Sequence, residues 1–165
     1  MGNASNQVSE VAELTGQQLD ALDRLWGRLR KVRAFSFNAS NGPGSQTNWR
    51  GHGRGEVSVE FFGAHILFAE QALFTDADGH KIELQNRYRW TRCVDHIRLE
   101  HLRREEPVLL FGLAPVTEHG FRHVQPHLCG KDTYTAELIL HSDEIELIWH
   151  IHGPRKNERL HYHYW

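Results

Sequence analysis

Hydrophobic and polar residues alternate along much of this chain, and a period of two is typical of a β-strand with one buried face. Residues 81–91 show it most clearly, with Leu84, Tyr88 and Trp90 on one face and charged or polar residues on the other. Runs rich in β-branched and aromatic residues mark the other segments. The chain therefore predicts strands near residues 31–39, 49–60, 65–75, 80–92, 95–103, 107–117, 120–125, 132–141, 144–152 and 158–165.

The segment before the first strand has a helical period instead. Thr15 is a suitable N-cap for a helix over residues 16–29, in which apolar side chains recur every three or four positions. The resulting stripe consists of Leu19, Leu22, Leu25, Trp26 and Leu29. Residues 1–14 predict a flexible tail, which leaves residues 15–165 as a single domain.

Turn-forming clusters such as Asp76–Gly79 and Gly153–Pro154 separate the predicted strands. Consecutive strands joined by short turns form an antiparallel meander, and a long meander with one apolar face loses its exposed edges by closing on itself. We therefore predict an all-β fold: an antiparallel barrel of about eight to ten strands with a short N-terminal helix.

Polar residues interrupt the apolar faces that should line the barrel interior. They are Glu70, Asn86, Tyr88, Asp132, Tyr134, Tyr162 and Tyr164. A carboxylate buried without a partner is costly, so an inward Glu70 or Asp132 must be paired, protonated or hydrated. Two interpretations stay open: the tyrosines close the barrel mouth while Glu70 pairs with Arg89 or Lys156, or the set forms a polar-lined site.

The composition narrows the function classes. With 165 residues, 39% hydrophobic and 24% charged, and a net charge of −2, the chain predicts one folded domain without general attraction to nucleic acid or anionic membranes. No apolar run approaches the roughly 18 residues that a membrane-spanning helix needs. The first residues lack the apolar centre of a secretion signal. These features predict a cytoplasmic protein.

Thirteen histidines are many for this length and raise the question of a metal. His127 and Cys129 could share a zinc ion or form a nucleophile–base pair, but two ligands do not make a site, and simple packing explains them as well. His150 and His161 would face each other outside the barrel if the turn between them closes a hairpin. We predict solvated surface histidines there and no metal site.

Asp132 and Tyr134 lie two residues apart on one strand face. They could act as a general acid–base couple at the barrel mouth, with Lys156 shifting their pKa values. Asp132 could equally accept hydrogen bonds from its own turn, with Lys156 in solvent. The spacing leaves both interpretations open.

The second half of the chain carries the pattern His127-x-Cys129-x-x-Asp132-x-Tyr134, followed by Trp149 and Gly153-Pro154-x-Lys156. With Glu70 and Arg87-Tyr88-x-Trp90 upstream, it resembles an uncharacterised bacterial family known only as a domain of unknown function, over roughly residues 30–164. The resemblance implies a lipocalin-like (calycin) barrel and supplies no activity.

The run Trp49-Arg50-Gly51-His52-Gly53-Arg54-Gly55 is similar to the Gly-rich strand of nitrobindin-type haem barrels. That resemblance implies an iron ligand near the C-terminal strand, where His161 and His163 are the candidates. Both fall on the face opposite Leu160 and should point outward. Alternate glycines could also serve barrel bending alone.

The leading prediction is a barrel that binds a small, partly apolar ligand. One alternative is an enzyme of the isomerase or cyclase type, with Asp132, Tyr134 or His127 as proton donors and acceptors; another is the haem barrel. A small molecule is the expected partner, whereas the ligand, any cofactor and the oligomeric state stay unidentified. The expected ligand-binding residues are Glu70, Tyr88, Trp90, His127, Cys129, Asp132, Tyr134, Trp149 and Lys156.

Overall fold

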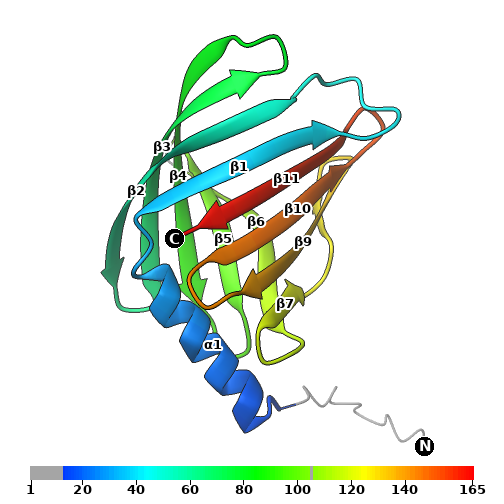
Figure 1. The fold of residues 1–165 in the computed structure, drawn as a ribbon. Coiled ribbons are helices and arrows are strands. Elements are labelled where there is room, and N and C mark those ends of the chain that lie inside the picture. Colours follow the sequence, from blue (N-terminus) through cyan, green and yellow to red (C-terminus); the bar gives the residue numbers. More distant parts are fainter. Residues whose placement is uncertain (1–12, 105) are drawn as a thin grey trace, which may run out of the picture.

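A computed structural model describes residues 13–104 and 106–165, and Figure 1 shows them as a closed antiparallel barrel with one helix against it. The tail expected over residues 1–14 therefore falls largely outside the described residues. The elements are α1 (Gly16–Leu29), β1 (Ala34–Asn41), β2 (Gly51–Phe62), β3 (His65–Asp76), β4 (Lys81–Arg92), β5 (Ile97–Arg103), β6 (Glu106–Pro115), β7 (Gly120–His123), β8 (His127–Cys129), β9 (Asp132–Leu140), β10 (Ile145–His152) and β11 (Asn157–Tyr164).

The barrel closes because the last strand returns to the first. Each strand pairs antiparallel with its neighbour in the chain, except that β7 pairs with β9, and β11 completes the ring by pairing with both β10 and β1. This confirms the all-β antiparallel barrel, and ten strands in the ring are consistent with a lipocalin-like architecture. The short β8 was not predicted; it pairs with the first residues of β9, on the same edge of β9 that pairs with β7 further along.

The helix begins and ends where the sequence predicts. Thr15 accepts a hydrogen bond from the backbone of Gln18, and the Gln18 side chain accepts one from the backbone of Thr15, which forms a capping box. The buried face of the helix differs from the predicted stripe. Ala21, which is outside that stripe, is buried, whereas Leu19, which belongs to it, is 40% exposed. Within the described residues no helix is long and apolar enough to cross a bilayer.

α1 covers one end of the barrel, below it in Figure 1, while the β10–β11 turn lies at the opposite end. Arginines fasten the helix to loops at its own end: Arg28 donates to the carbonyls of His141 and Ser142, and Arg24 donates to that of Glu118. Four helical residues, Ala21, Leu22, Leu25 and Leu29, join the barrel core. The helix therefore closes one end and leaves the other available to a site.

The glycines of β2 make room for the barrel's own side chains. A Cβ on Gly53 would meet the Phe37 ring at 2.2 Å, and a Cβ on Gly55 would overlap the backbone of Gln71 on β3. These positions allow strand and ring packing, so the barrel itself accounts for the glycines that suggested a haem-binding strand.

Candidate functional site

A pocket of about 240 Å³ opens into the barrel at the end away from the helix. Its aromatic wall consists of Phe37, Trp49, Tyr88, Tyr134, Trp149 and Tyr162, and the aliphatic residues are Leu84, Leu110, Ile151 and Leu160. The polar lining residues are Asn86, His101, Arg103, Lys156 and Glu158. An apolar cavity with a few convergent polar groups is the usual anatomy of a small-molecule site.

The aromatic wall is held by mutual stacking. Tyr134 on β9 stacks on Trp149 on β10 with ring centroids 6.3 Å apart, and Trp149 lies 6.2 Å from Tyr162 on β11. On the other side, Tyr88 stacks on His101 at 4.9 Å. These strands are neighbours in the ring, so their inward side chains form continuous flat surfaces.

Glu70 lies on β3 beside this pocket, and its side chain is 2% exposed. Its cross-strand partner is Asn86, which lines the pocket, so the two side chains share the inner face. Glu70 Oε2 accepts a hydrogen bond of 2.7 Å from the Tyr164 hydroxyl, while Oε1 is buried without a partner among the described residues. A carboxylate in this position would be poorly compensated.

Burial raises the pKa of Glu70 to about 8, and the hydrogen bond from Tyr164 offsets only part of that rise. The carboxyl group is therefore mainly protonated at neutral pH. Burial also raises the pKa values of the Tyr88, Tyr162 and Tyr164 hydroxyls above the usual range for tyrosine. The nearby Glu70 adds to the rise for each of them. Four ionisable groups thus form an uncharged, hydrogen-bonding floor, in which Tyr88 and Tyr162 line the pocket and Glu70 and Tyr164 lie just outside its lining.

Neither predicted ion-pair partner of Glu70 reaches it. Arg89 points outward and binds Glu100 at 2.6 Å, because residues 87 and 89 alternate with the inward Tyr88. Lys156 lies 3.6 Å from Asp132 instead. The interpretation of Glu70 as half of a salt bridge with Arg89 or Lys156 is therefore wrong.

Charged residues gather at the mouth rather than at the floor. Glu158 accepts a hydrogen bond from Thr47 at 2.5 Å, and Arg103 Nε donates to His101 Nδ1 at 3.0 Å. Burial, with a smaller contribution from the Arg103 charge, lowers the pKa of His101, so its ring is neutral at pH 7. The pocket therefore runs from a neutral floor to a charged rim.

Residues 28–165 match a family described as "Family of unknown function (DUF6314)". The chain belongs to this family. The match spans every strand of the barrel and agrees with the resemblance to an uncharacterised domain seen in the sequence. No curated protein and no solved structure matches the chain.

In this DUF6314 barrel the predicted ligand-binding residues divide into three groups. Tyr88, Tyr134, Trp149 and Lys156 line the pocket, and Glu70 lies beside its floor. Trp90 does not reach it, because it is 1% exposed and packs edge-on against Phe68 deeper in the core. The third group, His127, Cys129 and Asp132, lies on β8 and at the start of β9.

Asp132 and Cys129 line a second hollow of about 550 Å³ between the β8–β9 and β10–β11 turns. His127 faces Tyr134 with ring centroids 6.2 Å apart. Among the side-chain hydrogen bonds of residues 13–104 and 106–165, none joins Asp132, Tyr134 and His127. The geometry thus gives the proposed acid–base group no direct connection, and its catalytic role stays a prediction.

The histidines considered as haem ligands point away from the interior. His161 and His163 alternate with the buried Leu160, Tyr162 and Tyr164 and lie on the outer wall. A pocket of about 240 Å³ is also small for a porphyrin. The residues present therefore do not fit a haem at the C-terminal strand.

Sequence reasoning missed several pocket residues, among them Trp49, His101, Arg103 and Glu158. Alternation could have found His101 and Arg103, because they share a face with the buried Ile97 and Leu99. Trp49 precedes β2 in a loop, where no period applies, and it reaches the pocket by stacking on Phe74 at 4.7 Å.

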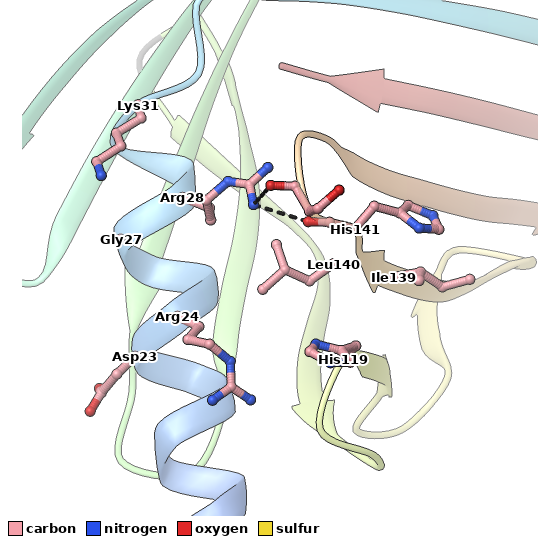
Figure 2. Close-up of a pocket in the computed structure, with 10 residues that line it drawn as sticks. Asp23, Arg24, Gly27, Arg28, Lys31, His119, Ile139, Leu140 and His141 are labelled. Atoms are coloured by element: carbon pink, nitrogen blue, oxygen red, sulfur yellow. Dashed lines mark hydrogen bonds between the residues drawn. The ribbon is translucent and has the colours of Figure 1, made fainter.

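A larger open hollow of about 720 Å³ lies between α1 and the β9–β10 turn. Figure 2 shows Arg28 reaching across it to the backbone around His141, with Leu140 facing the helix. Its arginines are used to fasten α1, and it lies outside the barrel ring. We interpret this hollow as part of the packing interface between the helix and the barrel, although its volume exceeds that of the pocket inside the barrel.

Proposed function

We propose that this DUF6314 barrel binds a small, partly apolar molecule in the pocket opposite α1. The observation that carries the proposal is the neutral polar group beside the aromatic wall: Tyr88 and Tyr162 line the pocket, and the buried Glu70 and Tyr164 lie next to it. Polar groups that converge in an apolar cavity fix the orientation of a ligand and give it specificity.

Packing alone gives no reason for this floor. Glu70 shares the inner face of β3 with Phe68 and Phe74, and an apolar residue there would avoid the cost of burying a carboxyl group. Glu70 Oε1 and Trp149 Nε1 are both buried without hydrogen-bond partners among the described residues. Buried polar atoms normally have a partner, so a bound molecule or water would complete this interior.

The lining also indicates the ligand class. The flat surfaces of Tyr134 and Trp149 favour an aromatic or otherwise planar body, and the uncharged floor favours a neutral hydroxyl, carbonyl or amide at the inner end. Arg103 and Lys156 at the mouth would tolerate a polar or anionic outer end. The cavity is slightly below the usual range of about 300–1,000 Å³, which favours a ligand of one or two rings.

The five tryptophans provide a test with internal controls. Trp49 and Trp149 line the pocket, whereas Trp26, Trp90 and Trp165 do not. In protein labelled with ¹⁵N at tryptophan, single-ring probes such as p-cresol and 4-hydroxybenzoate should shift the indole signals of Trp49 and Trp149 and leave the other three unchanged. If such probes shift none of the five signals, or only Trp26 or Trp165, the pocket proposal fails.

A further inference from the structure

A cluster of histidine and glutamate side chains lies on the outer wall of the barrel. Glu146 on β10 is the direct cross-strand partner of His163 on β11, and His161 lies on the same face two residues earlier. Inward neighbours such as Leu147 and Tyr162 are buried, which sets the cluster on the opposite side of the wall from the pocket. One potential ligand atom from each of Glu146, His161 and His163 lies within 4.8 Å of the other two.

The turn between β9 and β10 adds two residues to this cluster. His141 Nε2 lies 3.3 Å from Glu146 Oε2, and Glu144 Oε1 lies 3.3 Å from His163 Nδ1. A carboxylate that holds one ring nitrogen of a histidine fixes its tautomer and directs the other nitrogen to a metal. Glu144 is placed to do this for His163, and His141 is placed to supply a further nitrogen.

The side chains of the cluster are partly buried, and one of its nitrogen atoms lacks a hydrogen-bond partner among the described residues. The side chains of Glu146, His161 and His163 are 19%, 30% and 27% exposed. His161 Nε2 is buried and makes no hydrogen bond within the described part of the chain, although it lies 3.7 Å from Glu146 Oε1. A cation bound between these groups would give this nitrogen a partner.

We propose that Glu146, His161 and His163 bind a zinc ion on the outer wall, and that His141, whose Nε2 now contacts the other oxygen of Glu146, turns toward the ion as the fourth ligand. Imidazole nitrogen and carboxylate oxygen are ligands that zinc accepts in tetrahedral geometry, at about 2.0–2.2 Å. Ligand atoms around such an ion are roughly 3.3 Å apart, so small side-chain rotations close the present spacing of Glu146, His161 and His163. The bound ion would cross-link β10 to β11 and both strands to the β9–β10 turn.

This site differs from the surface pair expected from the sequence. His150 and His161 do not face each other, because the register pairs His161 with Ile148 and His150 with Arg159. The nearest ring to His161 is that of His163, with centroids 4.6 Å apart. Strand register, rather than histidine number, therefore defines which residues can share the ion.

The test is calorimetric titration of the full chain with ZnCl₂, after removal of any affinity tag and of bound metal. The wild type should bind one ion per chain, and His161→Ala and Glu146→Gln should each lose affinity about tenfold or more. His150→Ala is the matched control, since this histidine lies on the outer face of the same hairpin outside the cluster. It should bind as the wild type does.

Two readouts of the wild type do not depend on a variant's folding. Co²⁺ in place of zinc should give the strong visible absorption of a tetrahedral site, and zinc should raise the melting temperature. Binding well below one ion per chain, unchanged affinity in His161→Ala, an equal loss in His150→Ala, or only the weak absorption of octahedral Co²⁺ would each overturn the proposal.

Discussion

Tyr164 donates a hydrogen bond of 2.7 Å to Glu70 across 94 positions of the chain. The bond joins the last strand of the ring to the third, and both residues are buried. The bond depends on the closed barrel, because the pairing of β11 with β1 holds Tyr164 on the inner face. This contact therefore links closure of the fold to the neutral floor of the pocket.

Glu70→Gln should remove a pH dependence from the stability of the protein. Unfolded, Glu70 ionises near pH 4.5, whereas folded it holds its proton until about pH 8. Between these values the folded state binds one more proton, so the free energy of unfolding falls by about 1.4 kcal/mol per pH unit as pH rises. Below and above that window Glu70 contributes nothing to the slope.

Urea denaturation at half-unit steps from pH 4.5 to 8 measures this effect. Glu70→Gln should flatten the profile and be more stable than the wild type near pH 8. Glu60→Gln, an exposed carboxylate on β2, is the control and should keep the wild-type slope. Identical slopes for the wild type and Glu70→Gln would show that Glu70 ionises normally in the folded state.

Tyr164→Phe tests the other half of the pair. The change leaves both carboxyl oxygens of Glu70 without the phenol donor, which should cost about 1–3 kcal/mol of unfolding free energy at pH 7. Because the bond from Tyr164 lowers the pKa of Glu70, its loss should also move the upper edge of the pH window higher. Tyr134 provides the control, because its hydroxyl makes no hydrogen bond to Glu70, so Tyr134→Phe should leave the upper edge of the window in place. A shift as large in this control would contradict the assignment of Tyr164 as the hydrogen-bond partner of Glu70.

Gly53→Ala and Gly27→Ala should have opposite effects on stability. The new Cβ at position 53 would lie 2.2 Å from the Phe37 ring, and such overpacking costs about 1–3 kcal/mol. At position 27, in α1, the Cβ meets nothing within 4 Å, and replacing a helical glycine gains about 0.5–1 kcal/mol. Urea midpoints give both values. Phe37→Leu should restore part of the loss in Gly53→Ala, and no restoration would remove Phe37 as the cause.

How far the sequence could predict this molecule depends on the range of each interaction. Helix 16–29 was predicted correctly, because its cap and its period are local. Period-two alternation correctly placed Glu70, Tyr88 and Trp149 inside, since it requires only neighbouring residues. The partner of Glu70 could not be found in this way, because Tyr164 reaches it through ring closure.

The rest of the site depends on register and loops. Asp132 was expected to face the cavity with Tyr134, but β9 begins at Asp132 and places it at the rim beside Lys156. Trp49 enters the pocket from a loop without any periodic signal. Likewise, the grouping of Glu146 with His163 requires the β10–β11 register, which sequence spacing alone does not determine.

Trp49→Leu and Trp149→Leu should separate ligand binding from stability. Trp49 is half-buried and stacks on Phe74 from a loop, so its loss should cost little more than about 1 kcal/mol while weakening the binding of single-ring probes. Trp149 contacts Phe111, Tyr134 and Tyr162 within the barrel, so its replacement should cost about 3 kcal/mol or more and weaken binding as well. Urea denaturation and titration with 4-hydroxybenzoate measure the two effects. If Trp49→Leu binds the probe with wild-type affinity, Trp49 belongs to the outer covering of the barrel rather than to the binding pocket.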